Sequence, residues 1–99
     1  MAVCSISVVP IGTTTPSISQ YVADCVRVLD SFKDLKYDLS AMCTIVEGDL
    51  DRILEAVKRM HGVPFEKGAQ RVLTSLTIDD RQDKGLTIEG KLRAVKEKF

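Results

Sequence analysis

Residues 36–49, KYDLSAMCTIVEGD, decide the fold of this chain. They hold two short β-prone runs, residues 36–40 and 42–47, with only Ala41 between them. Strands joined by so short a connection can pair only in the antiparallel direction, because a parallel pair needs a crossover of about a dozen residues or more. Gly48 and Asp49 then end the second run, and Asp49 is a typical helix N-cap. We therefore expect a β-hairpin that leads straight into a helix.

The expected helix after Asp49 is amphipathic. Apolar residues recur there at spacings of three and four, and Asp51 in the first turn complements the helix dipole. Gly62 follows the last apolar position and Pro64 comes two residues later, which is the usual pattern at a helix end. We predict that the helix stops there, with His61 as a cation at its C-terminus. The predicted buried stripe consists of Leu50, Ile53, Leu54, Val57 and Met60.

The segments on either side of this centre add two strands and two helices. Residues 3–10 alternate between apolar and serine side chains and end in proline, which predicts a strand with one buried face. Ser17 and Gln20 have the spacing of a capping box and begin an amphipathic helix that we expect to end near Lys33. Residues 71–80 alternate again and predict the last strand. Thr87 is the expected N-cap of a short C-terminal helix.

The order strand, helix, strand, strand, helix, strand, helix indicates a single domain over residues 1–99. Two βαβ halves with right-handed crossovers close naturally into a four-stranded antiparallel sheet with two helices on one face. The predicted fold is therefore an α+β sandwich of the ferredoxin-like βαββαβ type, followed by a short C-terminal helix. A domain of this size buries a modest share of its surface, so self-association would stabilise it.

Two helices cover only one face of such a sheet, so the opposite face must meet something else. The residues out of phase with the expected core are small, uncharged or apolar, whereas a face in water would carry several lysines, arginines or glutamates. We expect a second copy of the chain to meet it about a twofold axis, paired face to face or edge to edge, as a homodimer through the sheets. The alternative is that the C-terminal helix folds back over it. The residues assigned to this face are Val3, Ser5, Ser7, Val9, Met42, Thr44, Val46, Leu73, Ser75 and Thr77.

Composition argues against several classes of function. Fourteen basic and fourteen acidic side chains give a net charge of zero, so the overall charge attracts neither a nucleic acid nor an anionic membrane. Cys4, Cys25 and Cys43 are far apart and lie among apolar residues, which disfavours a disulfide framework or a metal site. The N-terminus has no basic segment and no apolar run is long enough to span a bilayer, so we expect a cytoplasmic protein.

The sequence offers few candidates for catalysis. No serine or cysteine lies near a base in sequence, and there is no glycine-rich phosphate loop. Thr13 and Thr14 precede the first helix, where free amides and hydroxyls can hold an anion, although such a run is more often a turn. Acidic side chains also stand at the ends of two expected strands, at Glu47 and at Asp79. We predict a binding protein without catalytic residues, metal or cofactor.

Several groups of residues, taken in order, match a known family. Tyr37-x-Leu39 is followed by Met42-x-Thr44-x-x-Glu47-Gly48-Asp49, and later by Arg71-Val72-x-Thr74 and Ile78-Asp79-x-Arg81. In this order they resemble the thiamine-binding protein family, small proteins of bacteria, archaea and yeast. The likeness extends from Val8-x-Pro10 to Lys91-x-x-x-Val95, and residues 44–49 are its most specific part.

The resemblance implies a ferredoxin-like domain that dimerises through its sheets and then forms a homotetramer. It also implies a ligand near the subunit contacts, thiamine or a related pyrimidine, which Thr44 and Glu47 face, with Ser7, Thr13 and Thr14 close by. These roles suit the chemistry, because a hydroxyl and a carboxylate can pair with the donors and acceptors of an aminopyrimidine. A carboxylate also favours the cationic thiazolium ring, so Glu47 would be the orienting anion.

Two other functions are compatible with the predicted architecture. A regulatory module of the ACT or nitrogen-sensor kind binds another metabolite or anion at its subunit interfaces, and a ligand on the helix side together with a larger partner enzyme would favour it. An acid-base isomerase using Glu47 or Asp79 is the remaining alternative. A Glu47→Gln variant that binds ligand normally but loses turnover would favour that enzyme.

Overall fold

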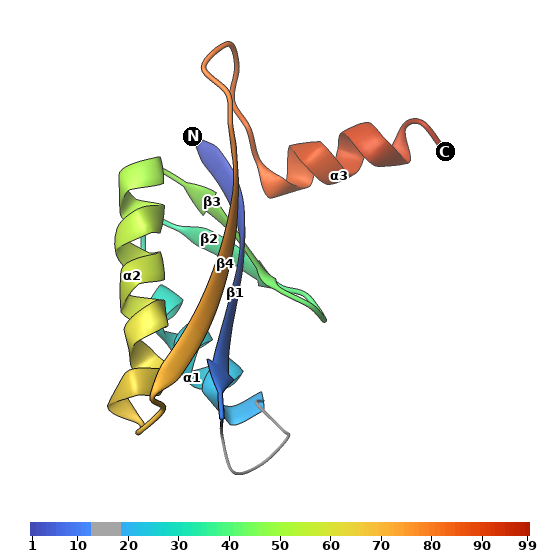
Figure 1. Ribbon diagram of the computed structural model, residues 1–99. Coiled ribbons are helices and arrows are strands. Elements are labelled where there is room, and N and C mark those ends of the chain that lie inside the picture. Colours follow the sequence, from blue (N-terminus) through green and yellow to red (C-terminus); the bar gives the residue numbers. More distant parts are fainter. Residues whose placement is uncertain (13–18) are drawn as a thin grey trace.

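The computed structural model describes residues 1–12 and 19–99. Its elements follow the predicted order, and the strands form one antiparallel four-stranded sheet in the order β2-β3-β1-β4 (Figure 1). The ferredoxin-like α+β arrangement is therefore confirmed, while the predicted cap at Ser17 lies outside the described residues. The elements are β1 (Ala2–Ile11), α1 (Ser19–Asp30), β2 (Lys36–Leu39), β3 (Thr44–Gly48), α2 (Leu50–Glu66), β4 (Arg71–Asp80) and α3 (Ile88–Lys96).

Helices α1 and α2 lie together on one face of the sheet, and α3 lies on the opposite side (Figure 1). The core is the layer between the sheet and the first two helices. Each large apolar side chain that is fully buried there contributes roughly 1.5–3 kcal/mol to the free energy of folding. This layer therefore stabilises the fold. Its largest fully buried side chains are Cys4, Ile6, Leu29, Val46, Ile53 and Met60.

Strand β3 has the opposite phase to the one predicted from the sequence. Thr44 and Val46 lie opposite core residues of β1 and are buried, so both face the helices. Ile45 and Glu47 face outward instead. The prediction is wrong because both phases of this run contain β-branched residues, so alternation alone does not distinguish them. Met42, also assigned to the outer face, precedes the strand and is 87% exposed.

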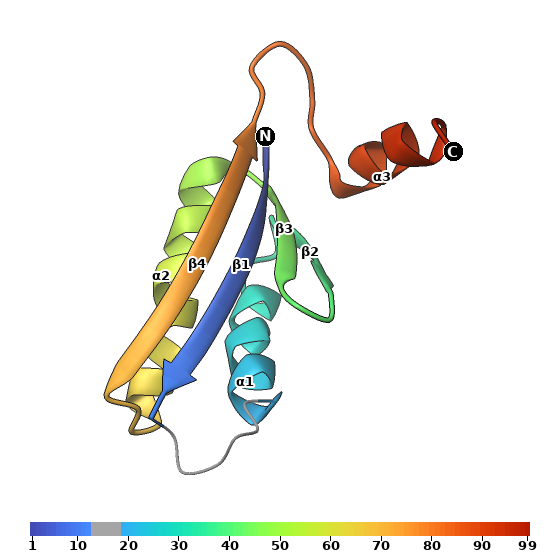
Figure 2. The ribbon, with the colours of Figure 1, turned by 45° about the vertical axis from the view of Figure 1, so that its right-hand side comes forward.

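The assignments on β1 and β4 agree with the structure. The opposed pairs Ser5–Thr77, Ser7–Ser75 and Val9–Leu73 alternate with the core residues of β1 and therefore turn away from α1 and α2. Helix α3 reaches only one end of this outer face (Figures 1 and 2). None of the residues of α3 is buried. The described part of the chain thus covers the outer face of the sheet only partly.

The sheet has a step, because β1 is longer than its neighbour β3. Strand β3 pairs only with residues 2–6 of β1, whereas β4 pairs with β1 along its whole length. Beyond Ile6, β1 therefore has a strand on one side only in the described part of the chain. The step leaves space between β1, α1 and the β2–β3 connection.

Helix α2 continues past the glycine and proline that predict its end. It ends at Glu66, and Pro64 is buried within its last turn. A proline here leaves the carbonyl oxygen of Met60 without its usual N–H donor. The thiol of Cys25 donates to that oxygen instead, at 3.4 Å. Gly68, with a φ of 97°, is the glycine that follows the helix end.

His61 consequently lies inside α2, and its predicted role at the helix end is wrong. Its Nδ1 is 2.6 Å from Oγ1 of Thr74 on β4, and its ring packs edge-on against Phe65 with the centroids 5.5 Å apart. This contact ties α2 to the sheet. Leu54, also predicted in the buried stripe of α2, is 41% exposed, so the stripe is narrower than expected.

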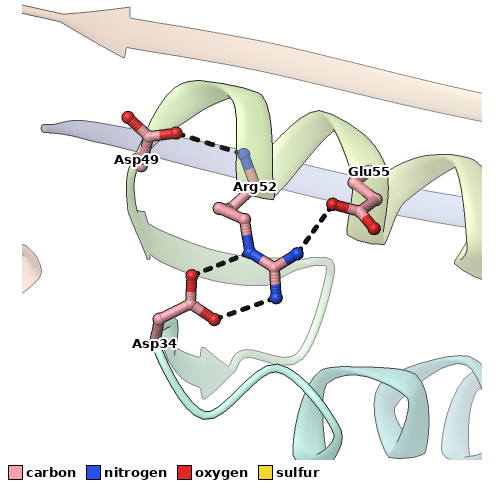
Figure 3. Close-up of polar contacts among 4 residues, drawn as sticks. All are labelled: Asp34, Asp49, Arg52 and Glu55. Atoms are coloured by element: carbon pink, nitrogen blue, oxygen red, sulfur yellow. Dashed lines mark hydrogen bonds and ion pairs between the residues drawn. The ribbon is translucent and has the colours of Figure 1, made fainter.

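Arg52 fixes the start of α2 against the loop between α1 and β2 (Figure 3). Its guanidinium group donates to Asp34 through Nε at 2.8 Å and Nη2 at 3.2 Å, and to Glu55 through Nη1 at 2.7 Å. The same group lies 4.7 Å from the centre of the Phe32 ring, a cation–π contact. Asp49 accepts a hydrogen bond from the Arg52 N–H at 3.4 Å and is the N-cap, as predicted.

Gly48 lies where β3 passes this loop. Its φ is 156°, and a Cβ atom there would lie 2.4 Å from Cδ2 of Leu35. Only glycine therefore fits without displacing Leu35. Residues 47–49 each have a structural role, because Glu47 accepts a hydrogen bond from α3 and Asp49 caps α2.

Candidate functional site

A cavity of about 470 Å³, called cavity 1, opens at the step in the sheet between β1, α1 and the β2–β3 connection. Ser7 and Thr44 both line it. The structure thus brings together two of the residues that the family resemblance associates with a ligand. The walls come mainly from residues of β1, α1 and the β2–β3 connection, and α2 contributes Met60. Other lining residues are Ser19, Val22, Val26, Ser40, Cys43 and Met60.

Cavity 1 has no charged side chain among the described residues that line it. Its polar lining residues are Ser7, Ser19, Ser40 and Thr44, together with Cys25 and Cys43. A hydroxyl can both donate and accept a hydrogen bond. A charged group would lose its hydration here without gaining an opposite charge, which is costly. The cavity therefore suits a neutral heteroaromatic ring, and its volume is within the usual range for small-molecule sites.

Two cysteines border cavity 1, and their environments differ. Cys25 is buried, and this burial, with a smaller effect from Asp24, raises the pKa of its thiol to about 11. Such a thiol is almost wholly protonated at neutral pH and reacts slowly. Cys43 is half-buried just before β3. Cys43 is therefore the accessible thiol of this cavity.

Glu47 does not line cavity 1. Thr44 and Glu47 are three residues apart on one strand, so their side chains point to opposite faces of the sheet. The Glu47 side chain is buried near α3, where its Oε1 accepts a hydrogen bond from the Ile88 N–H at 3.0 Å. Lys36 lies directly opposite Glu47 on β2, and both residues line a small pocket beside α3. Glu47 thus has a partner within the chain and lies apart from Ser7 and Thr44.

A second cavity of about 430 Å³, called cavity 2, lies on the outer face of the sheet beneath α3. Its lining includes Ser5 and Thr77 from the sheet and two carboxylates, Asp38 and Asp79. Asp79 forms an ion pair with Lys91 of α3. The sequence singled out Asp79, but Asp38 and Lys91 were missed because their meeting depends on where α3 docks. No local sequence pattern gives that information.

Of the remaining candidates from the sequence, Arg81 lines neither cavity. Thr13 and Thr14 lie outside the described residues. Arg81, grouped with Asp79 in the sequence, instead pairs with Asp83 at 2.5 Å. Residues 1–12 and 19–99 contain no group of three or more His, Cys, Asp or Glu side chains that could hold a metal. None of the helices in the same residues is long and apolar enough to cross a membrane.

The fold and cavity 1 together define a class of protein, a small ferredoxin-like α+β domain with a partly uncovered sheet face and an uncharged, hydroxyl-lined cavity. Within that class, the model of the family described as thiamine-binding protein matches residues 4–96. The chain belongs to this family. The family resemblance carried by residues 44–49 is thereby confirmed.

Relatives of similar length occur in bacteria and archaea. The UPF0045 protein YqgV of Bacillus subtilis is 42% identical over 98 residues, which cover 96% of this chain and 94% of that one. The crystal structure of the hypothetical protein MJ1052 from Methanocaldococcus jannaschii is 43% identical, with a TM-score of 0.87 over 97% of this chain and 96% of that one. TM0486 from Thermotoga maritima, described as a candidate thiamine biosynthesis/salvage protein, is 28% identical, with a TM-score of 0.77 over 95% and 97%.

Proposed function

We propose that this chain is a cytoplasmic, homo-oligomeric protein that binds thiamine or a related pyrimidine in cavity 1 and does not act as an enzyme. The observation that carries the proposal is the meeting of Ser7 and Thr44 in an uncharged, mainly apolar cavity. Ser7 belongs to the outer face of β1 and Thr44 to the helix side of β3, so the ligand would lie across the step in the sheet. There the donors and acceptors of an aminopyrimidine ring could pair with a hydroxyl on each side, and its faces could pack on Val22 and Val26. Thr13 and Thr14 are proposed as further contacts, because they follow β1 and precede α1.

The cationic end of a thiamine-type ligand needs a carboxylate, which cavity 1 lacks among its described lining residues. Ser40 borders both cavities, and Asp38 lines cavity 2. A ligand that extends past Ser40 would bring its thiazolium ring toward Asp38. Hydroxymethylpyrimidine has no such cation, so it tests the ring site by itself.

The outer face of the sheet supports the homo-oligomeric part of the proposal. The outer face is only partly covered by α3 and carries small or apolar side chains such as Ser5, Val9 and Leu73, of which Leu73 is 56% exposed. Packing on a second copy would bury this face and form a homodimer through the sheets, and two dimers would form a tetramer. Glu47 points away from Thr44, so it would contact the same ligand only in an assembly where a second copy supplies it.

Calorimetry with thiamine and with hydroxymethylpyrimidine tests the function directly. Ser7→Ala and Thr44→Val should each weaken binding by about tenfold, the usual effect of losing one neutral hydrogen bond. Thr77→Val, which lies in cavity 2, is the matched control and should leave the affinity for the pyrimidine unchanged. A folded wild-type protein that binds neither compound would remove the thiamine assignment. Mass spectrometry of bound ligand after long incubation should recover it unaltered, whereas a product would indicate an enzyme.

A further inference from the structure

Cys43 lies at the opening of cavity 1. It lines the cavity and is half-buried, so it is in contact with both the cavity and the solvent. The Ser40 N–H donates to the Cys43 carbonyl oxygen at 2.9 Å, which continues the pairing of β2 and β3 by one residue and fixes the Cys43 backbone. Cys43 is next to Thr44 in this extended run, so its side chain turns to the other face of the sheet, the one that carries Ser7.

The hydroxyl of Thr44 independently indicates that cavity 1 takes a ligand. Thr44 is only 4% exposed, and its hydroxyl has no hydrogen-bond partner among the described residues. A buried polar group without a partner is costly, so this hydroxyl is suited to pair with a bound molecule. The volume of about 470 Å³ is sufficient for a small molecule. Cys43 therefore borders a space that a small molecule can enter.

The other two thiols of the chain are not open to the same chemistry. Cys4 and Cys25 are buried in the core, and the Cys25 thiol donates to the Met60 carbonyl oxygen at 3.4 Å. Cys25 borders cavity 1 from the helix side of the sheet, whereas the Cys43 side chain turns to the opposite side, and a disulfide needs Cβ atoms that are directed at each other. Burial also raises the pKa of Cys25 to about 11, so little of its thiolate is present to attack a modified Cys43.

We propose that Cys43 is a modification site for a low-molecular-weight disulfide, and that the mixed disulfide formed there closes cavity 1 to its ligand. The Cys43 thiol loses its proton to solvent, and the thiolate attacks one sulfur of the small disulfide. The S–S bond of the small disulfide breaks as a new S–S bond forms to Cys43 Sγ, and the thiolate that leaves takes up a proton. A free small thiol reverses the exchange, so the modification acts as a reversible switch.

The chemistry of cavity 1 favours an uncharged disulfide. The described residues that line it include no charged side chain, so a charged adduct would lose hydration there without gaining a partner. An adduct on Cys43 takes up space on the side of Ser7, one of the two residues proposed to hold the pyrimidine. The effect on binding rests on the proposed function, whereas the modification of Cys43 does not.

Hydroxyethyl disulfide, a small uncharged compound, is the probe. Incubation of the chain should give a single adduct, which peptide mass spectrometry should place on Cys43 and which dithiothreitol should remove. In calorimetry the capacity to bind hydroxymethylpyrimidine should fall in proportion to the modified fraction and return on reduction. Cys43→Ser is the matched variant, and hydroxyethyl disulfide should leave its affinity, whatever its value, unchanged. Cys25→Ser should respond as wild type does, because its thiol is buried.

A measurement that needs no pyrimidine tests where the adduct lies. The NMR methyl signals of Val9 and Val26, which line cavity 1 from β1 and α1, should shift on modification, whereas those of Val57 in the core should not.

Four outcomes would each overturn the proposal: an adduct on another cysteine, a disulfide within the chain, unshifted Val9 and Val26 signals, or a modified chain that binds the pyrimidine as well as the reduced chain does. A reduced chain that binds no pyrimidine, although modification of Cys43 shifts Val9 and Val26, would remove the proposed function and support the modification site.

Discussion

The carboxylate of Glu47 accepts a hydrogen bond from the backbone N–H of Ile88 at 3.0 Å, which joins the end of β3 to the start of α3. The N-terminus of a helix has free N–H groups and a partial positive charge, so a carboxylate is well placed there. Thr87 satisfies a second N–H, that of Gly90, at 2.9 Å. Because no residue of α3 is buried, these contacts and the pair Lys91–Asp79 largely set its position.

Replacing Glu47 with alanine should therefore loosen α3. The Ile88 N–H would lose a charged acceptor in a partly buried position, which costs about 1.5–3 kcal/mol. Hydrogen exchange of the amides of residues 88–96 should accelerate while that of α2 stays slow. Glu89→Ala is the matched control, since Glu89 is in the same helix turn but its side chain is 81% exposed. Unchanged exchange in α3 of the Glu47→Ala variant would contradict this role.

Two glycine-to-alanine variants should have opposite effects on stability. Gly48→Ala places a Cβ atom 2.4 Å from Leu35 Cδ2 at a φ of 156°, and should destabilise the fold by about 1–3 kcal/mol. Gly62→Ala lies within α2 with nothing within 4 Å of the new Cβ, and should stabilise it by up to about 1 kcal/mol. Denaturant unfolding measures both. A destabilised Gly62→Ala variant would argue against a continuous α2.

Much of the fold was predictable because its signals are local. The bounds of β4, Arg71–Asp80, follow from alternation, and Asp49 and Thr87 cap their helices through their own side chains. A short connection likewise forces β2 and β3 to pair antiparallel. Each of these features depends on residues that are close in sequence.

The errors arose where a distant residue decides the outcome. Pro64 is tolerated inside α2 because the thiol of Cys25 donates to the carbonyl oxygen that the proline leaves unpaired. The phase of β3 is set by its register with β1, since Ile45 and Val46 are equally suited to burial. The contacts at the candidate site were hard to predict for the same reason, because they join residues that are distant in the sequence. The meeting of Ser7 with Thr44 was suggested only by family resemblance, and the hydrogen bond of Glu47 to α3 had no signal in the sequence.

The pH dependence of stability should reveal the contact of Asp34 with Arg52. The Arg52 guanidinium holds the pKa of the Asp34 carboxyl below its ordinary value, despite a smaller opposing effect of desolvation. A carboxyl whose pKa is lower in the folded state stabilises the fold above its unfolded pKa, near 4, and loses that contribution as pH falls through the folded pKa. Wild type should therefore unfold at a higher temperature than Asp34→Asn at pH 7, and the difference should vanish between about pH 4 and pH 2.

Two controls separate the Asp34–Arg52 contact from general effects of charge on stability. They are a charge-matched variant and added salt. Asp51→Asn removes one exposed carboxylate from the first turn of α2 and leaves the Asp34–Arg52 pair in place, so it is the charge-matched control. High salt should reduce the difference between wild type and Asp34→Asn, because both side chains of the pair are about half exposed and therefore screened. A difference in unfolding temperature that persists at pH 2 would show that Asp34 acts through packing instead of charge.

The cysteines provide a probe of cavity 1 in the unmodified chain. Cys43 should be the one thiol that reacts quickly with a colorimetric disulfide reagent at pH 8, because Cys25 and Cys4 are buried and burial raises the pKa of each. Denaturation should expose all three thiols.

Ligand in cavity 1 should shield Cys43, which lines it together with Ser7 and Thr44. At ten times the dissociation constant of hydroxymethylpyrimidine, mass action predicts that labelling of Cys43 slows by about tenfold. Thr44→Val should lose this protection in parallel with its loss of affinity, while Thr77→Val should keep it. Protection that persists in Thr44→Val, or a Cys43 rate that ignores bound ligand, would place the ligand outside cavity 1.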